Sequence, residues 1–293
     1  MKKLLIVLLT LILFSNISFS QTVENTVFID SVSKSIGNIK EELIKVNENI
    51  YIIQPYGMAG NTGVIISNDG VILVDDQWSM LVDRIKGLVL SLTDKEIKAI
   101  INTHYHFNHT NGNLAFGMDK IPIISQENAL FRMSQRQVMP TFFNVVQEAY
   151  PENAQPSITF LEKFILHEQD ETIELIHLKN AHTDGDLIVY FKNANVYYTG
   201  DIFVSYGLPH IDELAGGEIY GIIEAVDYLL QNSNKGTRFI PGHGPLSTVE
   251  DVKKYGDLLK TLLTSVEELT KAKMEITDII EQVKTRGENE MDL

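Results

Sequence analysis

The sequence predicts an α/β fold in which two mixed β-sheets pack against each other and helices cover them. Short apolar runs with turn residues between them indicate strands, and longer segments with helical spacing of apolar residues alternate with these runs. No linker or internal repeat divides the chain. With 293 residues, of which 44% are hydrophobic, the chain is long enough to bury a sizeable core. We therefore expect one domain over residues 21–293.

The N-terminal segment has the features of a signal peptide. Lys2 and Lys3 precede an apolar run from Leu4 to Phe14, and Ser18-Phe19-Ser20 supplies small residues for cleavage. The run is shorter than the roughly 20 residues that span a bilayer, which argues against the alternative of an uncleaved anchor. We expect residues 1–20 to be removed near Ser20 and the protein to be exported to the periplasm or secreted, with no stable membrane span.

The first half of the mature chain reads as strands with one long helix. Asn68-Asp69-Gly70 is a strong hairpin turn between two of these strands. The helix follows from the spacing of Leu81, Ile85, Leu88 and Leu92. The predicted elements are strands at 51–53, 64–66, 71–74 and 97–101 and a helix at 80–92.

The second half continues the alternation, apart from one segment. Residues 138–156 hold three prolines and several aromatic residues, and this composition indicates an insertion or a lid. The other predicted elements are helices at 113–117, 126–133 and 218–230, strands at 121–124, 159–166, 172–178, 187–191, 196–199 and 238–240, and an amphipathic helix from 248 that is interrupted around 272–275.

The net charge restricts the classes of partner that the protein is expected to bind. The formal net charge is −15 at pH 7, with 39 acidic residues against 24 basic ones, two of which lie in the signal segment. An acidic surface repels phosphate backbones, so we expect a small-molecule substrate and no nucleic acid. The chain has no cysteine, so a metal site has to use histidine and carboxylate. The sequence leaves the oligomeric state open.

Five of the eight histidines lie in three short segments that each follow a predicted strand. Strand ends can bring such side chains to one edge of a sheet, and residues two apart on an extended strand end point to the same side. Imidazole and carboxylate suit zinc, and also iron or manganese. Scattered core or surface histidines are the alternative. With one aspartate that also follows a strand, the candidate metal ligands are His104, His106, His109, His182, Asp201 and His243.

These segments together resemble the metallo-β-lactamase superfamily over about residues 50–250. The order His104-Tyr105-His106-Phe107-Asn108-His109, Ala181-His182-Thr183, Gly200-Asp201 and Gly242-His243 is similar to the family's four motifs. The resemblance implies an αββα sandwich with the metals at one edge of the sheets. It also implies a first zinc on His104, His106 and His182, and a second on His109 and His243 with Asp201 between the two ions. Asp75, or alternatively Asp76, resembles the structural acid that braces the His104 loop.

One position departs from the family pattern, because Asn108 stands where the family has an aspartate. Two unit charges about 4 Å apart interact by roughly 4 kcal/mol at an effective dielectric of about 20, so the neutral amide should weaken the second metal site. We therefore expect Asn108 and Asp201 to be the residues that decide catalysis. One working metal, two metals or a loss of catalysis are the possible outcomes.

The resemblance implies attack of metal-bound hydroxide on a carbonyl such as a β-lactam, lactone, ester or thioester. The alternatives are an iron-dependent oxidoreductase of the same fold and a non-catalytic metal- or ligand-binding protein. The segment 54–61 resembles the hairpin loop that closes over substrate, and His210 is a candidate substrate contact. A β-lactam is the leading specific substrate. Its carboxylate requires a cation, and the candidates near the motif are Lys120, Arg132 and Arg136.

Overall fold

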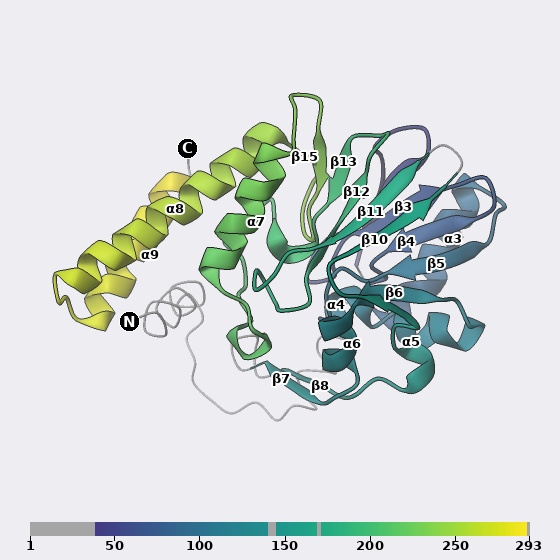
Figure 1. Cartoon of the computed structure of the whole chain (residues 1–293), viewed down its shortest axis with the longest axis horizontal. Coiled ribbons are helices and arrows are strands. Elements are labelled where there is room, and N and C mark those ends of the chain that lie inside the picture. Colours follow the sequence, from purple (N-terminus) through teal and green to yellow (C-terminus); the bar gives the residue numbers. More distant parts are fainter. Residues whose placement is uncertain (1–38, 140–144, 169–170, 292–293) are drawn as a thin grey trace.

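Two β-sheets lie face to face in the computed structural model, with helices on both outer sides (Figure 1). The structure describes residues 39–139, 145–168 and 171–291, and the side chains as far as residue 283. The predicted signal peptide lies outside these ranges. Within them, none of the helices is both long and apolar enough to cross a membrane.

The first sheet has seven strands in the order β1-β2-β3-β4-β5-β6-β9. The strands β1 to β4 pair antiparallel, whereas β4, β5, β6 and β9 run parallel. The predicted turn joins β3 and β4, and Ser67 N donates to Gly70 O at 2.9 Å. The bounds are β1 Glu41–Lys45, β2 Ile50–Pro55, β3 Thr62–Ile66, β4 Val71–Val74, β5 Ile97–Ile101, β6 Ile123–Gln126 and β9 Ile158–Phe160.

The second sheet has six strands in chain order, and only the β13–β14 pair is parallel. The prediction of one strand over 159–166 was wrong, because β9 belongs to the first sheet and β10 to the second. Phe160 and Phe164 both pack into the core between the sheets, so the alternation continues although the chain changes sheet. The bounds are β10 Lys163–His167, β11 Thr172–His177, β12 Leu187–Phe191, β13 Val196–Tyr198, β14 Arg238–Ile240 and β15 Ser247–Thr248.

Three apolar layers hold the sheets and helices together. Alternate strand residues point to opposite faces, so Ile65 packs between the sheets while its neighbour Val64 packs under α3 (Val82–Leu92) and α5 (Asn113–Phe116). On the other side, Phe239 packs against α7 (Ile219–Gln231), α8 (Val249–Lys271) and α9 (Ile276–Met291). This αββα arrangement confirms the predicted fold class. The break between α8 and α9 lies where the sequence predicts it.

The predicted insertion at 138–156 overlaps a separate two-stranded antiparallel sheet of β7 (Gln137–Met139) and β8 (Val145–Gln147), seen at the lower edge of Figure 1. Met139 and Tyr150 are buried against Tyr105 and Phe107, together with α6 (Glu127–Met133). The insertion therefore packs over the segment that carries the histidine-rich motif and begins α4 (Phe107–Thr110).

Candidate metal centre

The six predicted ligands come from four loops at one edge of the two sheets. His104 and His106 lie between β5 and α4, and His109 lies on α4. The loop of His182 follows β11, that of Asp201 follows β13 and that of His243 follows β14. β5 ends at Ile101 and the chain bends over residues 103–105, so the expected extended strand end under His104 and His106 was wrong. The bends bring the two rings together instead.

Three imidazoles form the first group. The ligand atoms of His104, His106 and His182 all lie within 4.8 Å of one another, and all three residues are buried. His182 Nε2 is 2.8 Å from His106 Nδ1. This is the set that the resemblance assigns to the first metal.

The second group adjoins the first. His109 Nε2 is 3.1 Å from His243 Nε2 and 3.2 Å from Asp201 Oδ1. Asp201 Oδ2 is 3.6 Å from His243 Nε2 and 3.7 Å from His182 Nε2. The carboxylate of Asp201 therefore lies between the two groups. The structure brings all six predicted residues together, and their role as ligands stays a prediction.

The outer nitrogens of two rings are held by acceptors. His106 Nε2 lies 3.0 Å from Asp212 Oδ2, and His182 Nδ1 lies 2.7 Å from the main-chain oxygen of His210. Because a carboxylate and a carbonyl only accept, these nitrogens carry the protons. His106 Nδ1 and His182 Nε2 are then the ring nitrogens that face the centre of the site, as in metal-binding histidines.

Asp75 holds the other two rings of the β5–α4 segment. Its Oδ2 lies 2.9 Å from His109 Nδ1 and accepts from Thr103 Oγ1 at 2.8 Å, and that hydroxyl lies 3.0 Å from His104 Nδ1. Its Oδ1 accepts from Thr103 N at 2.8 Å. A left-handed backbone at Asp75, with φ of 59°, aims the carboxylate at these donors. The bracing residue is thus Asp75 rather than Asp76.

The residues present fit a metal ion. His104 Nε2 is buried and has no hydrogen-bond partner among the described residues. Burial, and after it the neighbouring histidines, lowers the pKa of His182 to about 3 and holds the pKa of His104 well below its usual value. The rings of His104 and His182 are therefore neutral near pH 7, and His182 Nε2 lies 2.8 Å from His106 Nδ1. Imidazole nitrogens that converge in this way are ligands that zinc takes in proteins.

The second group also favours positive charge. Burial lowers the pKa of His109, but the carboxylates of Asp201 and Asp75 outweigh it and raise that pKa to about 10. Burial raises the pKa of Asp201, but the imidazoles of His109 and His243 hold it well below its usual range. Asp201 is thus ionised, and a proton on His109 supplies the positive charge in the absence of a metal.

Asn108 points its amide nitrogen into the second group. Asn108 Nδ2 donates to Met58 O at 3.3 Å, and a carbonyl acceptor fixes which side-chain atom is the nitrogen. The same Nδ2 lies 3.1 Å from His243 Nε2. An N–H therefore faces His243 Nε2, at the position where the family has a carboxylate.

Sequence reasoning missed Asp212, which is buried beneath His106 and also accepts from the hydroxyl of Tyr105. It is 106 residues from His106, and no local pattern marks it. Asp186 was missed too, although a recognisable turn motif carries it: it accepts from His182 N at 2.6 Å and from Thr183 N at 2.8 Å.

Two glycines allow the loops to approach one another. A Cβ at Gly60 would overlap the ring of His109, and a Cβ at Gly242 would overlap Asp201. The next residue, Asn61, donates from Nδ2 to the main-chain oxygens of Pro241 and Gly244, both at 2.9 Å. The end of the predicted 54–61 loop therefore joins the His109 and His243 segments, and residues nearer its middle border the site.

A cavity of about 330 Å³ opens beside the centre. Its polar wall is formed by His106, Asn108, Asp201, His210 and His243. Burial, and after it the neighbouring His106, lowers the pKa of His210 to about 4, so this imidazole is neutral as well.

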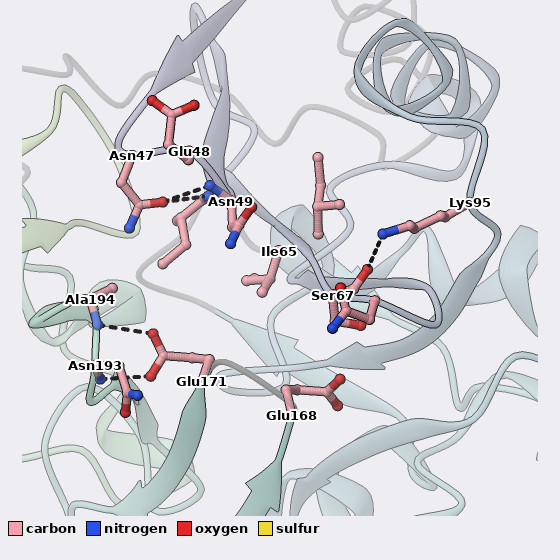
Figure 2. Close-up of a pocket in the computed structure, with 13 residues that line it drawn as sticks. Asn47, Glu48, Asn49, Ile65, Ser67, Lys95, Glu168, Glu171, Asn193 and Ala194 are labelled. Atoms are coloured by element: carbon pink, nitrogen blue, oxygen red, sulfur yellow. Dashed lines mark hydrogen bonds between the residues drawn. The ribbon is translucent and has the colours of Figure 1, made fainter.

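Another cavity, of about 380 Å³, lies at the opposite edge of the sheets, and none of the six predicted ligands lines it (Figure 2). Several of its polar side chains form hydrogen bonds with the protein's own main chain. Glu171 accepts from the main-chain nitrogens of Asn193 and Ala194, and Lys95 donates to Ser67 O. The smaller cavity, which adjoins the predicted metal ligands, is therefore the candidate substrate site.

The sequence of this chain is similar to a known family and to individual proteins. Residues 55–245 match the model of the Metallo-beta-lactamase superfamily. A probable metallo-hydrolase of Methanocaldococcus jannaschii is 21% identical over 65% of this chain and 90% of its own length. A hydroxyacylglutathione hydrolase of Pelagibacter ubique is 25% identical over 54% of this chain and 57% of its own.

Solved structures show the same fold. A metallo-beta-lactamase from Pontibacter korlensis superposes with a TM-score of 0.62 at 15% identity, over 75% of this chain and 99% of its own. The DIM-1 metallo-beta-lactamase superposes with a TM-score of 0.61 at 16% identity, over 76% and 99%. With the family match over most of the described residues, this chain belongs to the metallo-beta-lactamase superfamily.

Proposed function

We propose that this protein is an exported zinc-dependent hydrolase that cleaves a carbonyl substrate such as a β-lactam, lactone, ester or thioester. The observation that carries the proposal is the convergence of His104, His106 and His182 beside a cavity, with His104 Nε2 left without a partner among the described residues. These three residues would hold the first ion, and His109, Asp201 and His243 would hold the second.

A bound zinc supplies Lewis acidity and an activated water for attack on a carbonyl. The protein's part is to present the ligands and to position the substrate. Asp212, Asp75 and the carbonyl of His210 hold the outer ring nitrogens, so the inner lone pairs are preorganised. The carboxylate of Asp201, between the two groups, would balance part of the charge of the bound ions.

Asn108 makes the second site the weaker one in this proposal. Its N–H faces the nitrogen of His243 that a second ion would need, and it adds no negative charge. The same contact favours a second candidate function, a metal- or ligand-binding protein without catalysis. The first group is complete without Asn108, and for this reason we place hydrolysis first.

The relatives and the N-terminus support the remaining parts of the proposal. The names of the similar proteins include a hydroxyacylglutathione hydrolase and metallo-beta-lactamases. Export rests on the signal-like segment at residues 1–20.

The deciding experiment starts with the mature chain from residue 21, its N-terminus mapped after expression with the signal segment. Metal identity and stoichiometry are measured, and hydrolysis of a chromogenic cephalosporin, lactones and thioesters is assayed. We expect bound zinc and turnover that His182→Ala abolishes. Bound iron with oxygen uptake would indicate an oxidoreductase of the same fold. Inertness with zinc, iron and manganese would indicate a binding protein.

A further inference from the structure

We propose that the substrate is an uncharged ester, lactone or thioester with an apolar acyl group, and that a carboxylate on the acyl group is disfavoured. This proposal rests on the proposed function, because it names the substrate class of the same site. Among the proposed carbonyl substrates, it places neutral compounds ahead of carboxylate-bearing β-lactams.

Apart from its polar residues, the cavity beside the metal centre is lined mainly by apolar side chains. The side chains there come from four parts of the chain: the loop after β2, the start of α4, the β7 strand and the segment after Asp201. They are Met58, Phe107, Met139, Val204, Tyr206 and Leu208. An acyl chain that extends away from the metals would lie against thioether, aromatic and aliphatic groups, as in most small-molecule sites.

No lysine or arginine is among the described residues that line this cavity. Arg132 is held by Asp184 Oδ2 at 2.5 Å and by Leu214 O at 3.3 Å. Arg136 points to Glu148 on the surface, and the exposed Lys120 ends the 3-10 turn Gly117–Asp119. Of the three candidate partners for a β-lactam carboxylate, the two arginines are therefore paired with acidic residues, and Lys120 does not line the cavity. Residues 140–144, which follow Met139, add no lysine or arginine to the sequence.

Besides the histidines, the charged side chains at this cavity are carboxylates. Asp201 lies in its wall, and Asp212 is buried behind His106. A carboxylate placed away from the metals would lose water without gaining a cationic partner, and this cost opposes binding. A methylene group placed there gains from burial. With a volume of about 330 Å³, the cavity is at the small end of ligand sites and suits a short acyl group.

The test compares two acyl groups of similar length on the zinc-loaded mature protein. Para-nitrophenyl butyrate has a neutral acyl end, and mono-para-nitrophenyl succinate has a carboxylate there. We expect kcat/KM for the succinate to be lower by at least about tenfold. Across acetyl, propionyl and butyryl esters, kcat/KM should rise about threefold to fourfold per methylene. Equal or faster cleavage of the succinate would overturn the inference while the proposed hydrolase stands.

A charge inserted into the apolar wall should change this preference. In Leu208→Lys, a cation enters the cavity, and the ratio of succinate to butyrate cleavage should rise by about tenfold. The matched control is Leu161→Lys, which makes the same change at an exposed position between β9 and β10 and should keep the original ratio. Circular dichroism checks that both variants fold. An unchanged ratio in folded Leu208→Lys would contradict the placement of the acyl group.

A binding measurement tests this inference independently of catalysis. Butyrohydroxamate and succinate monohydroxamate are titrated into the zinc-loaded protein by calorimetry. Tighter binding of the neutral hydroxamate, by about tenfold, supports the inference even if no ester is cleaved, and the hydrolase proposal alone would then fail. Equal or tighter binding of the acidic hydroxamate would overturn the inference whether or not esters are cleaved.

Discussion

Replacing Asn108 by aspartate should strengthen the second metal site. Asn108 Nδ2 is 3.1 Å from His243 Nε2, so in Asn108→Asp a carboxylate oxygen would lie beside the ligand atoms of the second group. A unit charge and a divalent ion about 4 Å apart attract each other by roughly 8 kcal/mol at an effective dielectric of about 20. Desolvation of the carboxylate cancels much of this gain. A net gain of about 3 kcal/mol corresponds to roughly 100-fold tighter binding of the second ion.

The assay is a competitive titration of metal-free protein with zinc against a chromophoric chelator, with stoichiometry checked by mass spectrometry of the metals. We expect one tightly held ion in the unmodified protein and two in Asn108→Asp. Asn108→Ala removes the N–H from His243 without adding charge and should give an intermediate affinity. Asn153→Asp makes the same change of charge at an exposed position away from the site and should leave the stoichiometry at one. Two equally tight ions in the unmodified protein would refute the reasoning.

The remaining predictions concern support of the site and its coupling to stability. Asp212→Asn should lower first-site zinc affinity by about 10- to 100-fold, because His106 loses a charged acceptor; the same chelator titration measures this, and unchanged affinity would contradict the supporting role. Gly60→Ala should destabilise the fold by about 1–3 kcal/mol, because the added methyl overlaps the ring of His109. Gly87→Ala on α3 has open space and should stabilise by about 0.5–1 kcal/mol; chemical denaturation compares the two, and equal effects would argue against the close approach. Removal of zinc that was present at about 100 times its Kd should cost roughly 2.7 kcal/mol of stability, and calorimetry should show Tm lower by about 5–10 °C. An unchanged Tm would mean that the ion does not bind the folded protein.

Local patterns predicted most elements of the fold. The apolar runs of β3 and β4, the turn at residues 68–70 and the helical spacing in α3 each involve neighbouring residues, so these patterns are visible in the chain. The choice of sheet is not local. β9 and β10 alternate as one strand would, and only pairing with β6 and with β11 assigns them to different sheets.

The chemistry of the candidate site divides in the same way. Short motifs after strands sufficed to predict His104, His106, His109, His182, Asp201 and His243, because metal-binding side chains cluster in such loops. Tertiary structure decided which groups hold those side chains, since Asp212 approaches His106 across 106 residues. It also decided that the amide of Asn108 faces His243 and that no described lysine or arginine lines the cavity. The sequence by itself thus determined the fold class and the candidate ligands. The hydrogen-bond partners of those ligands, the charges beside them and the lining of the cavity depend on long-range packing, which brings together loops that share no local pattern.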